Sequence, residues 1–518
     1  MDNSCWWHPP LAGPIRGPAE LRQQMHARLL PDKQQPSIFA ASFGRDARNN
    51  PRDAGTTINF VSQLNVNLNL VQKYNVPGPR YTSYPPATKF TDAISWPQLT
   101  EKISKNNQTE RGLSLYFHIP FCETLCWFCG CTTVITLNHA QGKTYLDHLE
   151  REVAQVAAQL NPKRKVVQLH WGGGSPTFLR PDEIRRLGEI IKKHFTFSDN
   201  IEAGVEIDPR RLSREHIEAL RDIGFNRSSL GVQDFEPKVQ QAIHRIQPRE
   251  MTQQVLDWAR ELGFGSVNFD LIYGLPHQTA ESFDRTLDAV LEMEPDRLAV
   301  FSYAHVPWVK PAQKILEQKI LPTPETKLQL LKTVIERLTE NSRYVYIGMD
   351  HFARPTDELV AAQRNKTLQR NFQGYSTRGE ADIYAFGMSA ISQIPDAYWQ
   401  NEKELPHYYA ALDGNKLPLS RGYFVTDEDK IRRETIMRVM CDLSLDYSAM
   451  SQKLGVNFAE HFANELASLA PFEADGLVKR NSTGLEVTDA GRLFIRNLAM
   501  CFDNTLAPAS ERKHSKTI

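Results

Sequence analysis

The stretch HIPFCETLCWFCGC, residues 118–131, holds the side chains with the clearest capacity for chemistry. Cys122, Cys126 and Cys129 are separated by four and three positions, which lets three thiolates converge on one centre. A cubane iron–sulfur cluster has four irons, so three protein thiolates leave one iron open to another ligand. A bidentate amino-carboxylate cofactor can chelate that iron and receive an electron through it. The spacing therefore predicts a [4Fe–4S] cluster with an open coordination site.

Structural zinc is the main alternative for this cysteine loop. A closed zinc site needs four ligands, and Cys131 or His118 could complete such a set. Cys129 and Cys131 are only two positions apart, however, whereas zinc sites usually pair two separated CxxC knuckles. The spacing thus favours the cluster. It leaves Cys131 outside the ligand set, with a role in either substrate handling or electron handling.

The overall composition limits the class of protein. Four of the seven cysteines lie within ten residues, which is a poor disulfide framework and indicates a reducing compartment. Lysine plus arginine, 61, equals aspartate plus glutamate, 61, so no general attraction to nucleic acid is indicated. The N-terminus lacks a secretory signal, and no apolar run of about 18 residues occurs. We expect a cytoplasmic monomer with no nucleic-acid partner and no membrane span.

Apolar, strand-like runs alternate with amphipathic helical patterns, such as residues 144–160 and 181–195, from Leu113 onward. This alternation predicts an α/β fold with a parallel sheet and right-handed crossovers, and six units fit a partial (β/α)6 barrel. Sites in such folds lie at the carboxyl ends of the strands. The six predicted strands are residues 113–119, 166–171, 202–207, 226–232, 266–272 and 297–304.

The rest of the chain divides around this barrel. The final segment predicts a helical, winged-helix-like domain with a hairpin around Asn481–Gly484. The expected divisions are a disordered extension at 1–60, an N-terminal segment at 61–110 with the motif GPRYTSYP, the barrel at 111–345, a connecting region at 346–425 and the C-terminal helical domain at 426–518.

The motif CxxxCxxC after an apolar strand resembles the radical SAM superfamily, and further motifs narrow the resemblance. Together they are similar to the oxygen-independent coproporphyrinogen III oxidases, from about residue 67 to the C-terminus. The matching segments are YFHIPFCETLCWFCGC with Cys131 as a fourth cysteine, GPRYTSYP (78–85), HWGGGSPTFL (170–179), GVQDF (231–235), NFDLIYGLP (268–276), YIGMDHFARP (346–355) and RNFQGY (370–375).

This resemblance implies a [4Fe–4S] cluster and two S-adenosylmethionine (SAM) molecules per chain. The implied reaction is the oxidative decarboxylation of two propionates of coproporphyrinogen III, giving protoporphyrinogen IX in heme biosynthesis. An ordinary side-chain base cannot remove a β-hydrogen from an unactivated propionate, whereas a 5′-deoxyadenosyl radical can abstract it. The substrate and an unidentified reductant are the expected partners.

The resemblance also assigns cofactor contacts. The glycines of HWGGGS can let backbone groups approach a ligand closely, so Gly173, Gly174 and Ser175 are expected at SAM. Helix capping and plain core packing are the competing explanations for several members of this set. The other implied contacts are Glu206 for the first SAM, Gln233, Arg245 and Asp270 for the second, with Arg245 on its carboxylate, and Tyr116, Phe128, Ala304 and Ile391 at positions that contact the two molecules.

Two arginines are candidates for the substrate, which carries four carboxylates. They are Arg80 in GPRYTSYP and Arg354 in DHFARP, with Tyr81, Tyr84 and His351 nearby in sequence.

Two competing functions are weighed against the oxidase. A heme chaperone of the same superfamily would bind heme without turning substrate over, but Cys131, GPRYTSYP and the long C-terminal region favour the oxidase. A zinc-bearing nucleic-acid binder using the C-terminal domain is disfavoured by the balanced charge.

Overall fold

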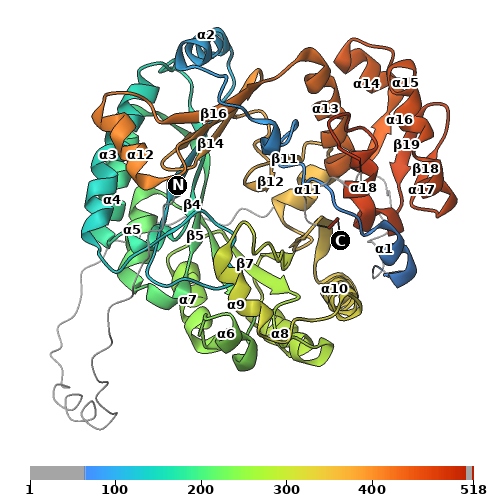
Figure 1. The fold of residues 1–518 in the computed structure, drawn as a ribbon, viewed down its shortest axis with the longest axis horizontal. Helices are drawn as coiled ribbons and strands as arrows, with labels where there is room; N and C mark the ends of the chain where they lie inside the picture. Colours follow the sequence, from blue (N-terminus) through green and yellow to red (C-terminus); the bar gives the residue numbers. More distant parts are fainter. Residues whose placement is uncertain (1–63, 65, 509–515, 518) are drawn as a thin grey trace, which may run out of the picture. The chain divides into compact units, whose positions relative to one another are not determined.

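A single large sheet organises the chain (Figure 1). The structure, a computed structural model, describes residues 64, 66–508 and 516–517. The twelve strands of this sheet, in spatial order, are β16 (Leu419–Phe424), β15 (Ala397–Asn401), β14 (Ile391–Ile394), β13 (Asp382–Phe386), β1 (Leu113–Ile119), β4 (Val166–Gly173), β5 (Phe197–Ile207), β6 (Arg227–Gln233), β7 (Ser266–Tyr273), β8 (Arg297–Ser302), β10 (His351–Ala353) and β9 (Val345–Gly348).

The parallel core of the sheet confirms the predicted α/β barrel architecture. The six predicted strands correspond to β1 and β4 to β8, and each pairs in parallel with the next. A seventh parallel strand, β13, pairs with the other edge of β1, with Leu115 opposite Tyr384. The sheet ends at β16 on one side and β9 on the other, so strand pairing leaves the barrel partial.

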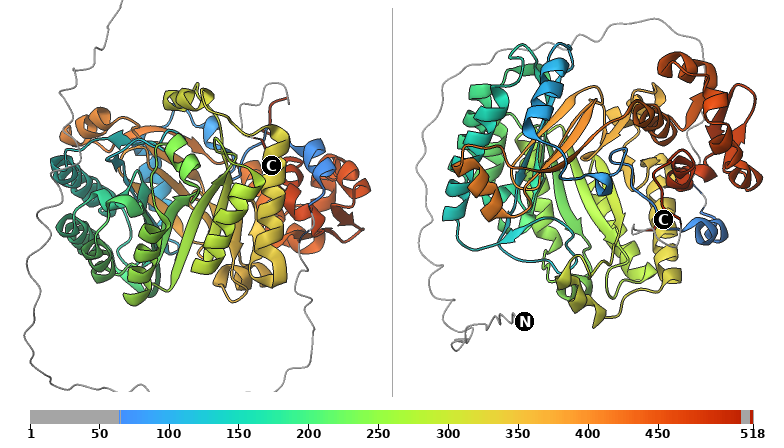
Figure 2. Two further views of the ribbon diagram at one scale, coloured as in Figure 1. Left: turned by 90° about the horizontal axis from the view of Figure 1, so that it is seen from below. Right: turned by 45° about the horizontal axis from the view of Figure 1, so that its top comes forward.

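The two faces of the parallel strands differ in polarity because successive side chains point to opposite sides. On β1, Leu115 and Phe117 are fully buried, while the intervening Ser114 donates a hydrogen bond to Gln168 at 2.8 Å. Gln168 in turn donates to Glu202 on β5 at 2.8 Å. Helices cover the apolar outer face (Figures 1 and 2). They are α3 (Ala140–Ala157), α4 (Pro181–His194), α5 (Arg214–Ile223), α7 (Arg249–Glu261), α8 (Ala280–Met293) and α10 (Pro324–Thr339).

Local signals explain where several of these helices begin and end. The hydroxyl of Thr279 accepts the backbone N–H of Ser282 at 3.1 Å, which caps the start of α8. Helix α5 ends at Gly224, whose φ of 111° lies in a region that side chains disfavour. The parallel pairing of the strands brings their carboxyl ends to the same edge of the sheet.

The C-terminal region forms its own small core and holds the GPRYTSYP segment. A three-stranded sheet contains the expected hairpin, where the N–H of Asn481 donates to the carbonyl of Gly484 at 3.0 Å. Tyr81 donates its hydroxyl to Asp503 at 2.9 Å, and Arg496 donates to the carbonyl of Pro79 at 3.1 Å. The elements here are α1 (Leu68–Tyr74), which packs beside this region in Figure 1, α13 (Asp427–Asp442), β17 (Ser444–Asp446), α14 (Tyr447–Leu454), α15 (Phe458–His461), α16 (Ala463–Ala467), α17 (Ala470–Ala474), β18 (Val478–Arg480), β19 (Gly484–Val487) and α18 (Ile495–Met500).

Short elements connect these parts. The expected extension at 1–60 lies outside the described residues, and the other predicted divisions of the chain stay predictions. Among the described residues, no helix is both long and apolar enough to cross a bilayer. The connecting elements are α2 (Trp96–Asn106), β2 (Phe121–Cys122), β3 (Val134–Ile135), α6 (Pro237–Ala242), α9 (Lys314–Glu317), α11 (Glu358–Arg364), β11 (Gln369–Asn371), β12 (Gly374–Ser376) and α12 (Leu405–Asp413).

Candidate active site

The cysteine loop follows β1 directly, at the carboxyl edge of the parallel strands. Its first part forms β2, which pairs with β3 after the loop has returned. Its middle is held from two sides. The N–H of Trp127 donates to the carbonyl of Ile243 at 3.1 Å, and Gln313 donates its side-chain amide to the carbonyl of Phe128 at 2.9 Å. The loop is therefore fixed at the edge where the sequence predicted a site.

Three glycines lie at the end of β4, and two of them, Gly173 and Gly174, pack against the start of this loop. A Cβ on Gly173, whose φ is 120°, would lie 2.8 Å from the carbonyl oxygen of Ile119. A Cβ on Gly174 would lie 2.5 Å from that of Pro120, and one on Gly172 would meet the Glu206 carboxylate at 2.8 Å. We expected the glycines to open space for a ligand. Their missing side chains also let the chain's own cysteine loop approach β4.

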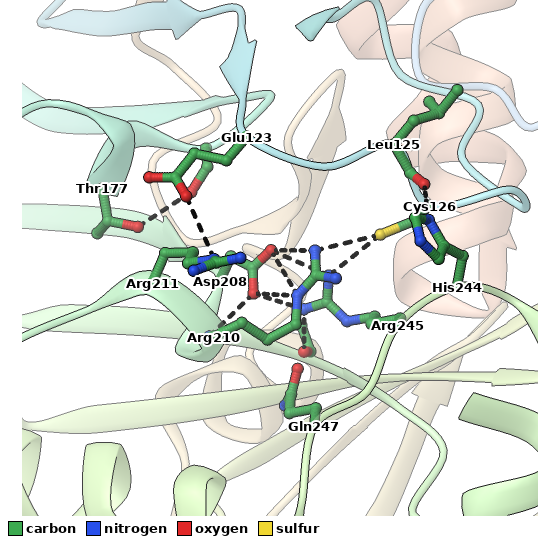
Figure 3. Close-up of polar contacts among 12 residues, drawn as sticks. Glu123, Leu125, Cys126, Thr177, Asp208, Arg210, Arg211, His244, Arg245 and Gln247 are labelled. Atoms are coloured by element: carbon green, nitrogen blue, oxygen red, sulfur yellow. Dashed lines mark hydrogen bonds and ion pairs between the residues drawn. The ribbon is translucent and has the colours of Figure 1, made fainter. Parts of the chain in front are cut away.

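The sulfur of Cys126 lies beside two arginines that share one carboxylate (Figure 3). Arg210 donates to Cys126 Sγ at 3.3 Å, and Arg245 donates to the same sulfur at 3.6 Å. Asp208 receives both guanidiniums, from Arg210 at 2.7 Å and from Arg245 at 3.1 Å. Burial opposes ionisation of Asp208, but Arg245 and Arg210 outweigh it and lower the pKa of this carboxyl.

The other cysteines differ in their electrostatic surroundings. Burial raises the pKa of Cys122 to about 12, whereas the hydrogen bond from Cys131 lowers the pKa of Cys129 to about 6. The backbone N–H of Cys131 also donates to Cys129 Sγ at 3.4 Å.

This donor set fits an anionic iron–sulfur cluster, since N–H groups and two cations point at its sulfurs. Among the described residues, no three His, Cys, Asp or Glu side chains are grouped as a single metal ion would require. A cubane places each thiolate on a different iron.

A cavity of about 480 Å³ opens on the polar inner face of the sheet. Tyr116, Glu206 and Ile391, three of the predicted SAM contacts, line it together with Arg80. The Glu206 carboxylate accepts the N–H of Gly173 at 3.2 Å and lies 3.5 Å from the imidazole nitrogen of His170. Burial raises the pKa of Glu206, but these two partners outweigh it, so the carboxyl pKa is lowered. An ionised carboxylate therefore faces the cavity.

A second group of predicted residues lies on β6 and β7 and on the segments that follow β6 and β8. Asp270 accepts hydrogen bonds from Ser229 and from Asn268, both at 2.9 Å, and burial raises its pKa to about 6. Arg245 donates to the carbonyl of Gly231 at 2.6 Å. Gln233 ends β6 with a φ of 68°, and Gln313 joins the carbonyls of Ala304 and Phe128. Ser175 lines a smaller cavity of about 310 Å³ with Cys122 and Arg210.

Unpaired polar atoms gather on the Arg80 side of the large cavity. Arg370 is buried, its Nη1 has no hydrogen-bond partner, and its guanidinium lies 4.8 Å from the centre of the Tyr375 ring. His351 Nδ1 and both polar atoms of the Gln373 amide are also unpartnered. Arg80 itself donates to the Asp350 carboxylate, while burial, with Arg370 and Arg496, lowers its pKa to about 9. Sequence reasoning did not name Arg370, although it lies in the matching segment RNFQGY.

Comparisons with known proteins identify the family. The Radical SAM superfamily model matches residues 116–290, and the HemN C-terminal domain model matches residues 425–494. The oxygen-independent coproporphyrinogen III oxidase of Escherichia coli is 47% identical over 446 residues, covering 86% of this chain and 97% of that protein. The protein of that name from Synechocystis sp. is 45% identical, covering 86% of this chain and 96% of its own length.

A solved structure agrees with the sequence matches. The structure entitled "Coproporphyrinogen III oxidase (HemN) from Escherichia coli is a Radical SAM enzyme" superposes with a TM-score of 0.82 at 46% identity. It covers 86% of this chain and 100% of that one. The chain belongs to the oxygen-independent coproporphyrinogen III oxidases. Membership of this radical SAM family implies a [4Fe–4S] cluster, as the cysteine spacing predicted, and SAM, as the resemblance implied.

One arginine predicted for the oxidase substrate lies elsewhere. Arg354 follows β10, and its guanidinium donates to the carbonyl of Pro295 at 3.1 Å and to that of Glu294. Ala353 pairs with Arg297, the first residue of β8, so this part of β10 lies at the amino end of the parallel strands. The structure therefore brings Arg80 to the cavity and leaves Arg354 at the opposite edge.

A buried hydrogen-bond network ties the cysteine loop of this oxidase to the turn after β13. Tyr145 donates its hydroxyl to the carbonyl of His118 at 2.7 Å and accepts the N–H of Met388 at 2.9 Å. Glu152 accepts the N–H of Gly387 at 2.8 Å and the hydroxyl of Tyr408 at 2.7 Å. The turn leads to Ile391 on the cavity wall, so α3 positions both sides of the site.

Proposed function

We propose that this chain catalyses the anaerobic oxidative decarboxylation of two propionates of coproporphyrinogen III, giving protoporphyrinogen IX. The names of its curated relatives support this reaction. The observation that carries the proposal within this chain is the juxtaposition of the cysteine loop with a cavity that Glu206, Arg80 and Arg370 line. A thiolate cluster site, a carboxylate for a cofactor and cations for an acidic substrate occur together there.

The cysteines and the polar inner face have separate tasks in this proposal. Cys122, Cys126 and Cys129 hold the [4Fe–4S] cluster. When bound, the cluster and SAM supply the carbon radical that removes a propionate hydrogen. Two SAM molecules bind per chain. Glu206 contacts the first, and Gln233, Arg245 and Asp270 contact the second. The remaining contacts with the two molecules are made by Tyr116, Phe128, Gly173, Gly174, Ser175, Ala304 and Ile391.

The hydrogen-bond geometry supports this division of the two SAM sites. Glu206 presents an ionised carboxylate to the large cavity, which suits a pair of ribose hydroxyls. Asp270 already accepts hydrogen bonds from Ser229 and Asn268, and these fix the orientation of its carboxylate. The carboxylate can then accept the ribose hydroxyls of the second SAM. Arg245 reaches the cysteine loop and can donate to a cofactor carboxylate in exchange for its contact with Asp208.

The substrate binds on the Arg80 side of the cavity in this proposal. Arg370 has an unpartnered guanidinium nitrogen there, and His351 and Gln373 have unpartnered polar atoms. A buried donor without a partner costs free energy that a propionate carboxylate would recover. These side chains orient the substrate and exclude water, while the radical removes the hydrogen.

Anaerobic reconstitution tests the proposal. The protein is loaded with iron and sulfide, reduced chemically, and supplied with SAM and coproporphyrinogen III. We expect bound iron, SAM cleavage and protoporphyrinogen formation, and a Cys126→Ser variant that shows none of them. A protein that cleaves SAM and binds heme but forms no product would instead support the heme chaperone. One bound zinc and no iron would refute the cluster itself.

A further inference from the structure

The exposed apolar side chains of the described chain are concentrated around the cysteine loop. Four belong to the segment that runs over the loop after β8: Trp308 is 76% exposed, Val309 62%, Ile320 72% and Ile315 37%. The other three large exposed apolar residues among those described are Ile135 and Leu137, which follow the loop, and Ile246, which follows Arg245, a donor to Cys126 Sγ. An apolar surface gathered at one place indicates an interaction site.

The segment 305–321 is attached directly to the cysteine loop. Its Gln313 donates to the carbonyl of Phe128 at 2.9 Å, and Lys310 Nζ donates to the carbonyl of Cys131 at 2.7 Å. Leu316 on α9 is fully buried in a small cluster that Trp127 and Phe128 also contact. The inner side of this segment thus covers the cysteine loop while its outer side exposes Trp308 and its neighbours.

The charges around this apolar surface are positive. Lys314 and Lys319 are exposed on the same segment, and Lys238 at the start of α6 is exposed as well and acts on the same histidine, His277, as Lys319. Burial together with Lys238 and Lys319 lowers the pKa of His277. The backbone N–H of His277 donates to the carbonyl of Ile320 at 2.8 Å, which ties this residue to the segment. The acidic residue of the segment, Glu317, is 3.2 Å from His305 and so is already paired. An apolar centre with a lysine rim is complementary to an acidic protein surface.

We propose that this surface docks an acidic, low-potential one-electron carrier protein that reduces the cluster. The surface is made by Trp308, Val309, Ile315 and Ile320, with Lys238, Lys314 and Lys319 as its rim. The inference rests on the proposed function, which requires an electron from outside the chain. In the transfer the reduced carrier loses one electron and the cluster gains it, with no bond formed or broken. The lysines steer the encounter, and the apolar centre holds the complex.

The test follows cluster reduction by stopped-flow spectroscopy in the full chain, with photoreduced plant-type [2Fe–2S] ferredoxin as the acidic probe and dithionite as the small reductant. Lys314→Glu with Lys319→Glu should slow reduction by ferredoxin about tenfold or more and remove its salt dependence. Trp308→Ala should weaken the complex, so that about tenfold more ferredoxin is needed to reach half of the maximal reduction rate. All variants should accept electrons from dithionite at the wild-type rate.

The matched control is Lys163→Glu with Lys192→Glu, which makes the same charge change at two exposed lysines outside the segment. An equal loss in the control, or a wild-type rate with ferredoxin that does not respond to salt, would overturn the docking surface. A wild-type dimer in sedimentation velocity that Trp308→Ala dissociates would assign the surface to a second copy. A wild-type cluster that dithionite cannot reduce would refute the proposed function instead.

Discussion

The N–H of Gly174 donates to the carbonyl of Ile119 at 2.8 Å, which brings the end of β4 against the start of the cysteine loop. The next carbonyl along, that of Pro120, leaves no room for a side chain on this glycine. The position of Cys122 therefore depends on a residue far along the chain that is not itself a ligand.

Gly174→Ala should displace the cysteine loop, because the added methyl would meet backbone atoms that cannot turn away. We expect a loss of about 1–3 kcal/mol in the free energy of unfolding. Iron and sulfide bound after anaerobic reconstitution should fall as well. Gly130→Ala is the control inside the same loop, since a Cβ there would have no neighbour within 4 Å. Normal iron binding by Gly174→Ala would show that the contact does not position the cysteines.

Arg210→Met should make the cluster harder to reduce. The variant keeps most of the side-chain volume and removes the charged hydrogen bond to Cys126 Sγ, which stabilises the more negative, reduced state. The midpoint potential should fall by tens of millivolts, given that about 59 mV is a tenfold change for one electron. Potentiometric titration monitored by electron paramagnetic resonance measures it. Arg211→Met is the control, because Arg211 pairs with Glu123. If Arg211→Met lowers the midpoint potential by the same amount, the effect is not specific to the hydrogen bond from Arg210 to Cys126.

Arg370→Gln should weaken substrate binding with little effect on SAM cleavage. Loss of a charged hydrogen bond to a propionate costs about 1.5–3 kcal/mol, which corresponds to a KM raised by about one to two orders of magnitude. Steady-state kinetics with coproporphyrinogen III would measure this. Arg354→Gln should lower the melting temperature, since it breaks contacts to Pro295 and Glu294, and leave KM unchanged. A raised KM in Arg354→Gln and an unchanged KM in Arg370→Gln would assign substrate binding to Arg354 and not to Arg370.

Asp270→Asn should stabilise the cluster-free protein near neutral pH. Burial raises the pKa of Asp270 from 3.8 to about 6, so between these values the folded chain holds a proton that the unfolded chain has lost. The free energy of unfolding therefore falls as pH rises through that window, by an amount of the order of 3 kcal/mol. Urea unfolding at pH 5 and pH 7.5 should show a larger gain for the variant at the higher pH.

The same Asp270→Asn variant should lose one SAM molecule, because an amide cannot accept two ribose hydroxyls as a carboxylate does. Equilibrium binding to the reconstituted protein would count the molecules bound. If the variant still binds as many SAM molecules as the wild type, Asp270 has no part in cofactor binding.

The parallel strands could be predicted because their sequence signal is local. Runs such as LSLYFHI are apolar enough to be buried, and β1 and β4 to β8 overlap the predicted runs, although β5 begins at Phe197, before the predicted start at 202. The position of Cys122 after the first strand also placed the loop at the correct edge. These features depend on residues that are neighbours in the chain, so they can be predicted from short stretches of sequence.

Features that depend on distant segments could not be predicted in the same way. Arg370 reaches Arg80 only because β11 is folded back beside the N-terminal segment, where Arg370 Nε donates to the carbonyl of Arg80 at 3.4 Å. Arg354 looked equivalent in sequence, but the antiparallel direction of β10 takes it to the other edge. The glycines after β4 were expected beside a ligand, and their contacts with Pro120 required knowledge of where the loop returns.

Strand β13 has a consequence for the evolution and engineering of this protein. It pairs with the edge of β1 that β4 does not occupy, and it comes later in the chain than all six of the other parallel strands. A chain truncated before Asp382 would have an unpaired, aggregation-prone edge on β1. It would also lack Ile391, which lines the large cavity. Residues 113–302 alone therefore do not form a self-sufficient catalytic domain. A fragment transferred to another protein must include β13 and β14 as well.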